Sequence, residues 1–306
     1  SLTSLCQLVV PDVLDGSTGS DNCGSLSWSQ SPTLATILAS DEGVTHTVTV
    51  TADDGNGNTS SCTVVMTGDD TTPPVPTCEG PQTIVLDAEC ELLVPDLTDG
   101  ASATDNCSSS FYWSQSPTAG AELASGEGTT HTITVTADDG NGNTATCTVV
   151  LTGDDTTPPV PTCEAAQTIM LDAECELPVP DVTDGSTAAD NCATSFYWSQ
   201  SPTAGTELAS GEGMTHTITV TVDDTNGNTA TCTVVLTGDD STPPVPVCEG
   251  PQDVTLDVDC ELVVLNLIDG ATVTDNCSSS FTWAQSPTAG TSLPSAHDMT
   301  HTITVT

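Results

Sequence analysis

The chain has 306 residues, no Lys or Arg, 43 Asp and Glu together and 5 His, which give it a formal net charge of -43 at pH 7. A chain without Lys or Arg cannot neutralise phosphate groups, so anionic membrane surfaces are poor partners and no nucleic acid is expected as a partner. Divalent cations are the partners that this charge favours. The sequence has no apolar run long enough for membrane insertion.

The sequence is a tandem repeat, because Cys78, Cys163 and Cys248 lie 85 residues apart and most of the sequence between them recurs. We predict complete copies at residues 73–157 and 158–242. Partial copies are predicted at 1–72, which lacks the first strand, and at 243–306, which lacks the last. Copies this alike have not diverged to build a unique active site, and no hydrolase motif is present, so the chain is predicted not to be an enzyme.

Taken in chain order, the copy at 73–157 contains short β-branched segments divided by Gly, Asn, Asp and Pro. They lie at residues 83–86, 90–94, 110–114, 131–136 and 145–152. Around Ile133 and Val135, apolar residues alternate with Thr, as in an antiparallel sheet that is buried on one face. About seven strands in 85 residues, without helical periodicity, predict an all-β fold of tandem immunoglobulin-like β-sandwiches.

Aromatic residues make up only 3% of the chain, so each sandwich core is expected to be thin. Trp113 is predicted to be the central core residue of its copy, with Trp28, Trp198 and Trp283 as its equivalents. The 14 Cys residues include no Cys-x-x-Cys pair and no Cys/His cluster. They therefore predict stabilising disulfides and an extracellular or cell-surface location.

Three motifs carry a resemblance to a known family. They are Pro-Pro-Val-Pro-Thr-Cys from Pro73, Asp-Asn-Cys from Asp105, and the run from Thr134 to Cys147 that contains Asp-Asp-Gly-Asn-Gly-Asn. Together they resemble the HYR (hyalin repeat) domain, especially its four-cysteine bacterial cell-surface form. The resemblance implies an immunoglobulin-related fold in an extracellular, adhesive protein. The chain departs from the family where Glu79, Glu164 and Glu249 replace the usual Pro.

The disulfide pairing is predicted from the sandwich and from the resemblance. In such a sandwich the first and last strands begin at the same end, which places Cys78 near Cys147, and the resembling family has members that keep only these two cysteines. The resemblance implies that the other two cysteines of each copy pair with each other. The predicted pairs are Cys78–Cys147, Cys163–Cys232, Cys90–Cys107, Cys175–Cys192, Cys260–Cys277 and Cys6–Cys23. Cys62 and Cys248 are left for a continuing or neighbouring chain.

Acidic and amide side chains recur in the linker between copies, in the Asp-Asn-Cys turn and in the Asp-Asp loop. In an immunoglobulin-like sandwich these segments converge where consecutive copies meet. Calcium needs six to eight oxygen ligands. The linkers between copies resemble those of cadherins, which are also acidic, end in proline and bind calcium. The alternative is that these residues only form turns and keep the chain soluble. The candidate ligands are Asp69, Asp70, Asp105, Asn106, Asp138, Asp139, Asn141, Asp154, Asp155, Asp190, Asn191, Asp223, Asp224, Asn226, Asp239, Asp240, Asp275 and Asn276.

These features favour a structural protein that forms a filament, stalk or surface fibre, assembled with copies of itself or as one continuing chain. The alternatives are an adhesin whose repeats bind a surface or glycan partner, and an acidic calcium-binding matrix protein. Glycans are also possible attachments, on the sequons at Asn58, Asn106 and Asn276 and on Thr-rich faces. Four His residues open equivalent strands and are expected on the surface.

Overall fold

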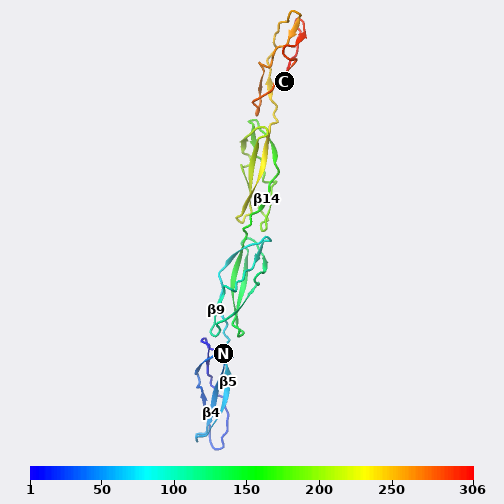
Figure 1. Cartoon of the computed structure of the whole chain (residues 1–306). Helices are drawn as coiled ribbons and strands as arrows, with labels where there is room; N and C mark the ends of the chain where they lie inside the picture. Colours follow the sequence, from blue (N-terminus) through cyan, green and yellow to red (C-terminus); the bar gives the residue numbers. More distant parts are fainter. The chain divides into compact units, whose positions relative to one another are not determined.

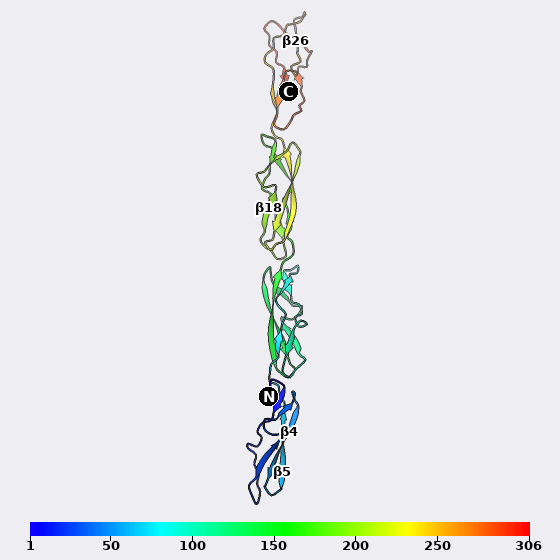
Figure 2. The same ribbon diagram turned by 90° about the vertical axis from the view of Figure 1, so that its left-hand side faces the viewer.

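The computed structural model describes residues 1–306, which form 27 short β-strands and no helix. The chain divides into two compact units, Ser1–Thr156 and Thr157–Thr306. Figures 1 and 2 show the strands, coloured from blue at the N-terminus to red at the C-terminus. No helix that is long and apolar enough to span a membrane is found.

The first unit contains thirteen of these strands. They are β1 (Gln7–Val9), β2 (Ser27–Ser31), β3 (Ile37–Ala39), β4 (Thr45–Asp53), β5 (Thr59–Thr67), β6 (Val75–Thr77), β7 (Gln82–Val85), β8 (Glu91–Leu93), β9 (Ser102–Thr104), β10 (Tyr112–Ser116), β11 (Glu122–Ala124), β12 (Thr130–Asp138) and β13 (Thr144–Asp154).

The second unit contains the other fourteen. They are β14 (Val160–Thr162), β15 (Gln167–Met170), β16 (Glu176–Pro178), β17 (Thr187–Ala189), β18 (Tyr197–Ser201), β19 (Glu207–Ala209), β20 (Thr215–Asp223), β21 (Thr229–Asp239), β22 (Val245–Val247), β23 (Glu261–Val263), β24 (Thr272–Thr274), β25 (Gln285–Ser286), β26 (Ser292–Pro294) and β27 (Thr304–Val305).

The complete copy in the first unit is an immunoglobulin-like sandwich. One sheet has the strand order β10-β12-β13-β7, in which β7 runs parallel to β13, and the pairs β8–β11 and β6–β9 complete the fold. The second unit repeats this arrangement with β18-β20-β21-β15, β16–β19 and β14–β17. The all-β immunoglobulin-like prediction is confirmed, but each complete copy has eight strands. The strands that match none of the predicted segments are β6, β9 and β11. Each has only three residues, too few to show a periodic pattern.

The longest hairpin in the first unit joins β12 to β13 and presents one face to the core. Its register runs from Thr130 opposite Thr152 to Asp138 opposite Thr144. Ile133 and Val135 are fully buried, whereas Thr132 is exposed and Thr134 and Thr136 are half-buried, so the predicted alternation is confirmed. The turn contains Gly140 at φ 80° and Gly142 at φ 104°, which residues with a Cβ rarely adopt.

The core consists of aliphatic side chains that both layers contribute. In the second unit Leu177 and Val179 of one layer pack against Ile218 and Leu236 of the other. Trp198 lies only partly buried at the margin of this cluster, and its equivalents Trp28, Trp113 and Trp283 are also half-buried. The prediction that Trp is the central core residue is therefore wrong, because branched aliphatic side chains fill the space between the layers.

The four strand-opening His residues are half-buried and not fully on the surface. Each has its Nε2 within 3.1–3.3 Å of a Ser hydroxyl oxygen. The pairs are His46 with Ser40, His131 with Ser125, His216 with Ser210 and His301 with Ser295.

A glutamine side chain braces each copy. Gln115 Oε1 accepts a hydrogen bond from Leu97 N at 2.8 Å, and its Nε2 donates to Pro95 O at 3.0 Å and Pro117 O at 3.2 Å. Leu97 is buried, so its backbone N–H needs the acceptor that this side chain supplies. Gln30, Gln200 and Gln285 make the same three contacts in the other copies.

Replacing this glutamine is expected to destabilise its copy. Gln115→Ala leaves the buried Leu97 N–H without an acceptor, so we expect the free energy of unfolding to fall by about 2 kcal/mol. Urea denaturation measures this loss. Gln252→Ala is the control, because that side chain is exposed and bonds only to Gly250 O. Equal stabilities of the two variants would show that the brace contributes nothing.

The disulfides fall into two kinds. Cys78–Cys147 and Cys163–Cys232 lie within copies, as the sequence predicts. Cys6–Cys107 and Cys175–Cys277 instead join one copy to the next within each unit. Cys90 and Cys192 are also disulfide-bonded, and Cys23, Cys62, Cys248 and Cys260 are exposed free thiols. The predicted pairs Cys6–Cys23, Cys90–Cys107, Cys175–Cys192 and Cys260–Cys277 are therefore wrong.

The reason for this error is that the two cysteines of each predicted pair lie at opposite ends of their copy. Because β7 is parallel to β13, the turn after β7 that carries Cys90 lies where β13 ends, and Leu86 N donates to Asp154 O there. Cys107 lies at the other end, beside the loop between β12 and β13, where Ser108 Oγ donates to Asp139 O. Cys107 can therefore reach the preceding copy and not Cys90.

Candidate cation site

Three carboxylates meet where the first copy joins the second. Asp70 follows β5, Asp105 lies in the turn between β9 and β10, and Asp139 lies in the loop between β12 and β13. Their ligand oxygens all lie within 4.8 Å of one another. Asp70 is 3% exposed and Asp139 is 6% exposed, so two of the three carboxylates are buried.

The loop around Asp139 is built to hold an ionised carboxylate. Asp139 Oδ1 accepts from Asn141 N at 2.8 Å and Asn143 N at 3.1 Å, while Oδ2 accepts from Asn143 Nδ2 at 2.7 Å. Burial raises the pKa of Asp139, but the combined hydrogen bonds from Asn143 and Asn141 outweigh it and hold the pKa below its usual value. The side chain is therefore a carboxylate at neutral pH.

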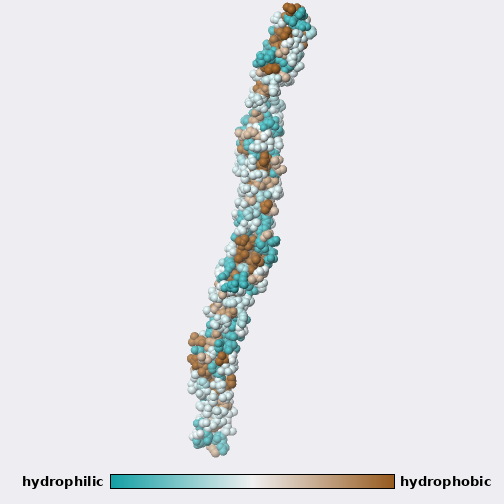
Figure 3. All heavy atoms as spheres, viewed as in Figure 1, coloured by the Kyte–Doolittle hydropathy of each residue, from teal (hydrophilic) through white to brown (hydrophobic).

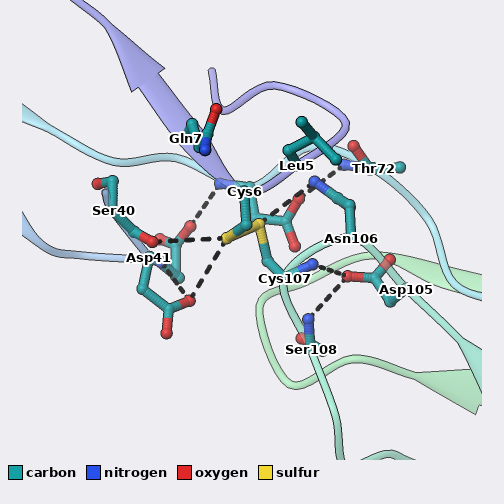
Figure 4. Close-up of a disulfide and its surroundings, with 12 residues drawn as sticks. Leu5, Cys6, Gln7, Ser40, Asp41, Thr72, Asp105, Asn106, Cys107 and Ser108 are labelled. Carbon is teal, nitrogen blue, oxygen red and sulfur yellow. Dashed lines mark hydrogen bonds between the residues drawn. A yellow bond between two sulfur atoms is a disulfide. The ribbon is translucent and has the colours of Figure 1, made fainter. Parts of the chain in front are cut away.

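Asp105 and its neighbour Asn106 present oxygens without a donor. Asp105 Oδ1 accepts from Cys107 N at 2.8 Å and Ser108 N at 2.9 Å, as Figure 4 shows. Asp105 Oδ2 and Asn106 Oδ1 are buried and have no hydrogen-bond partner. Buried acceptors without a donor are uncommon and costly, so their presence beside two further carboxylates indicates a place for a cation.

Asp70 ties the end of the first copy to the second. Asn143 Nδ2 donates to Asp70 O at 3.0 Å, and Asn141 Nδ2 lies 3.4 Å from Asp70 Oδ2. Glu42 Oε2 accepts from Asp70 N at 2.6 Å, which fixes the backbone that presents this carboxylate. The group thus takes one carboxylate from the first copy and two from the second.

The donor set fits a hard cation. Every available ligand atom is an oxygen, and the chain has no Lys or Arg that could neutralise three adjacent carboxylates. Calcium takes six to eight oxygens at 2.3–2.6 Å, whereas softer metals prefer sulfur or imidazole. The three carboxylates and Asn106 Oδ1 could supply part of such a shell, and water the remainder.

Other predicted ligands lie outside this group. Asp69 is exposed, and Asp138 Oδ1 accepts from Gly140 N, so it shapes the turn instead. Asp154 is in β13, where it pairs with Val85. Asp240 caps Thr242 N, and Asp275 Oδ1 accepts from Cys277 N and Ser278 N; neither belongs to a group of three carboxylates. The remaining candidates outside it are Asn141, Asp155, Asp190, Asn191, Asp223, Asp224, Asn226, Asp239 and Asn276.

The second unit repeats the local structure of two of the ligands. Asp190 Oδ1 accepts from Cys192 N and Ala193 N, as Asp105 does from its neighbours. Asp224 is fully buried and accepts from the backbone N–H groups of Asn226 and Asn228. Burial raises the pKa of Asp224, but the hydrogen bond that Asn228 Nδ2 donates to Asp224 Oδ2, together with these backbone bonds, holds it below its usual value.

A second acidic group, which the sequence does not predict, lies in the second unit. It consists of Asp172, Glu176 and Glu207, whose ligand oxygens also lie within 4.8 Å of one another. Desolvation and repulsion by Glu207 and Asp172 raise the pKa of Glu176. Glu207 is on β19, and only the register of β19 with β16 brings it to Glu176.

The fold and the site define the class of this protein: tandem, disulfide-bonded β-sandwiches with an acidic group where one copy joins the next. Within the chain, residues 154–237 match the family model of the HYR domain, so the predicted resemblance is confirmed and this segment is a HYR domain. The HYR domain and the disulfides point to an extracellular or cell-surface repeat protein of the adhesion type. Comparison with curated protein sequences gives no match.

Solved structures of cadherin-domain strings are similar to this chain. Protocadherin gammaB7 EC3-6, solved as a cis-dimer, is 14% identical, with 78% of this chain and 71% of that chain covered and a TM-score of 0.38. Mouse cadherin-23 EC22-24 is 14% identical over 70% of this chain and 86% of that chain, with a TM-score of 0.32. The strand topology and the HYR match define the fold.

Proposed function

We propose that the protein is a non-enzymatic extracellular structural protein that forms a filament, stalk or surface fibre. It consists of four copies, at residues 1–72, 73–157, 158–242 and 243–306, and calcium bound between copies stiffens it. The observation that carries this proposal is the group of Asp70, Asp105 and Asp139. Because its members come from two copies, a cation bound there would link the copies directly.

The charge of the group gives the cation its structural effect. Without a cation, three carboxylates within 4.8 Å repel one another, and this repulsion acts to separate the two copies. With calcium, the same carboxylates become ligands of one ion and hold the copies in one orientation. The sandwich cores and the disulfides within copies do not depend on the ion, so only the junction should respond to it.

Chelation is expected to make the chain flexible while each copy stays folded. Small-angle X-ray scattering of the full chain, with calcium and then with excess EDTA, measures this change as a broader and shorter distribution of interatomic distances. Far-ultraviolet circular dichroism should not change, because the strands persist. An unchanged scattering profile after EDTA would contradict cation stiffening, and loss of the circular dichroism signal would contradict its restriction to the junction.

A second candidate function is adhesion through the repeats, and one observation favours it. Tyr112 is 74% exposed and Tyr197 is 68% exposed, whereas the equivalent residues in the partial copies are Ser27 and Thr282. Exposed aromatic rings are common anchors for partners. Figure 3 shows the apolar side chains of one face as separate patches, which does not favour an extended apolar contact there. Glycan-array binding that is lost with Tyr112→Ser and Tyr197→Ser together would support adhesion.

The third candidate, an acidic calcium-binding matrix protein, differs from the stiffened fibre in stoichiometry. Isothermal titration calorimetry distinguishes them, because a stiffener binds a few ions tightly at its junctions. A matrix protein binds many ions weakly over its whole acidic surface.

A further inference from the structure

The disulfides of each unit close overlapping loops. In the first unit, Cys6–Cys107 spans a sequence separation of 101 and Cys78–Cys147 spans 69. In the second unit, Cys163–Cys232 spans 69 and Cys175–Cys277 spans 102. Each longer loop joins two copies, and each shorter loop closes a single sandwich.

We propose that the disulfides between copies, Cys6–Cys107 and Cys175–Cys277, carry tension past the folded sandwiches, so that each unit stays short when it is pulled, even if a sandwich unfolds. This inference deepens the structural role proposed above and gives it a mechanical basis. It depends on the connectivity of the disulfides and not on whether calcium is bound.

Both ends of the disulfide between copies are held in rigid turns. On the side of the first copy, Cys6 N donates to Thr3 O at 2.9 Å, and Leu2 N donates to Asp69 O at 2.9 Å. On the side of the second copy, Asp105 Oδ1 accepts from Cys107 N at 2.8 Å (Figure 4). The bond therefore connects parts of the two copies that hydrogen bonds already fix, and little slack separates it from either sandwich.

A hydrogen bond crosses the junction beside each of these disulfides. In the first unit Asn106 Nδ2 donates to Thr3 O at 3.0 Å. In the second unit Asn276 Nδ2 donates to Asp172 O at 2.9 Å, and Cys175 N donates to the same oxygen at 3.1 Å. The repeated combination of a disulfide and an adjacent Asn contact indicates a built connection between copies.

The connectivity sets how far the first unit can extend. Once its sandwiches unfold, the shortest covalent route from residue 1 to residue 156 crosses both disulfides and contains about 43 residues, or about 150 Å at ~3.5 Å per residue. Without any disulfide the route contains about 155 residues and extends to about 540 Å. The two bonds thus keep most of the chain out of the path of the force.

The two kinds of disulfide contribute unequally to this limit. Without Cys6–Cys107 the route contains about 86 residues, or about 300 Å. Without Cys78–Cys147 it contains only about 54 residues, or about 190 Å, because the segment from Cys107 to Cys147 is short. The bond between copies is therefore the main limit on extension, and the bond within the sandwich mainly stabilises the fold.

Single-molecule force spectroscopy tests this assignment. The full oxidised chain is pulled from handles at residue 1 and at position 156, and its limiting extension is measured. We expect about 150 Å for the original chain, about 300 Å for Cys6→Ser with Cys107→Ser, and about 190 Å for the control Cys78→Ser with Cys147→Ser. Equal extensions for the original chain and the Cys6→Ser/Cys107→Ser variant would overturn the proposal.

Misfolding of a variant does not remove this test, because the limiting extension depends on the covalent route and not on the folded state. Peptide mapping without reductant must recover a Cys6–Cys107 peptide from the original chain, and its absence would also overturn the proposal. Failure of the fibre function would appear differently, as an absence of filaments in electron micrographs with the extension values unchanged.

Discussion

Replacing Cys78 and Cys147 together by Ala is expected to lower the free energy of unfolding of the second copy by about 4 kcal/mol. The disulfide closes a loop with a sequence separation of 69, so its loss releases conformational entropy to the unfolded chain. The sandwich core is small and mainly aliphatic, and it cannot offset a loss of this size. Hydrogen exchange of β12 and β13 in increasing urea measures the change locally.

Cys62→Ala is the matched control for this prediction. Cys62 lies opposite Val50 in the hairpin of the first copy, as Cys147 lies opposite Val135 in the second, but Cys62 is an exposed free thiol. Its replacement should change the stability by less than about 0.5 kcal/mol. If the exchange of β12 and β13 is the same in the double variant and in the original chain, the disulfide is not a major source of stability.

Replacing Asp105 by Asn is expected to change stability in opposite directions with and without calcium. In EDTA, Asp105→Asn removes one of three neighbouring charges and supplies an N–H₂ group to the others, so we expect it to stabilise the junction by about 2 kcal/mol. In calcium the original chain gains the free energy of binding, about 2.7 kcal/mol at a concentration 100 times the Kd, and the variant gains little. The variant should then be the less stable of the two.

Thermal unfolding with calcium and with EDTA measures both effects. Asp21→Asn is the matched control, because Asp21 occupies the position of Asp105 in the first copy and likewise accepts from a Cys N–H, but belongs to no group of three carboxylates. It should give the same result in both buffers. If Asp105→Asn responds to calcium as strongly as the original chain does, the acidic group does not hold the ion.

The β-sandwich could be predicted from the sequence because the pattern that indicates it lies within single strands and recurs in every copy. Alternation around Ile133 and Val135 depends only on which face of a strand is buried, and each copy contains the same pattern. The convergence of Asp70, Asp105 and Asp139 could also be predicted, because it follows from the order of strands in the fold. Which of two adjacent carboxylates turns inward could not: Asp70 is buried and Asp69 exposed, and Glu42, which accepts from Asp70 N, lies 28 residues away in the sequence.

The pairing of the other cysteines could not be predicted from similarity among copies, because equivalent cysteines in every copy have the same sequence surroundings. Only the direction of β7 beside β13 shows that Cys90 and Cys107 lie at opposite ends of one copy. The group of Asp172, Glu176 and Glu207 was missed for a related reason. Its third member comes from a separate strand, and three-residue strands leave no signal of their register in the sequence.

The overlap of the disulfide loops also governs what a protease can do to the chain. A cut anywhere between Cys6 and Cys107 lies inside the loop that these residues close, and a cut between Cys107 and Cys147 lies inside the loop closed by Cys78 and Cys147. Any single cleavage between Cys6 and Cys147 therefore leaves the first unit as one covalent molecule. A protein exposed to enzymes outside the cell would keep its two ends joined after such damage.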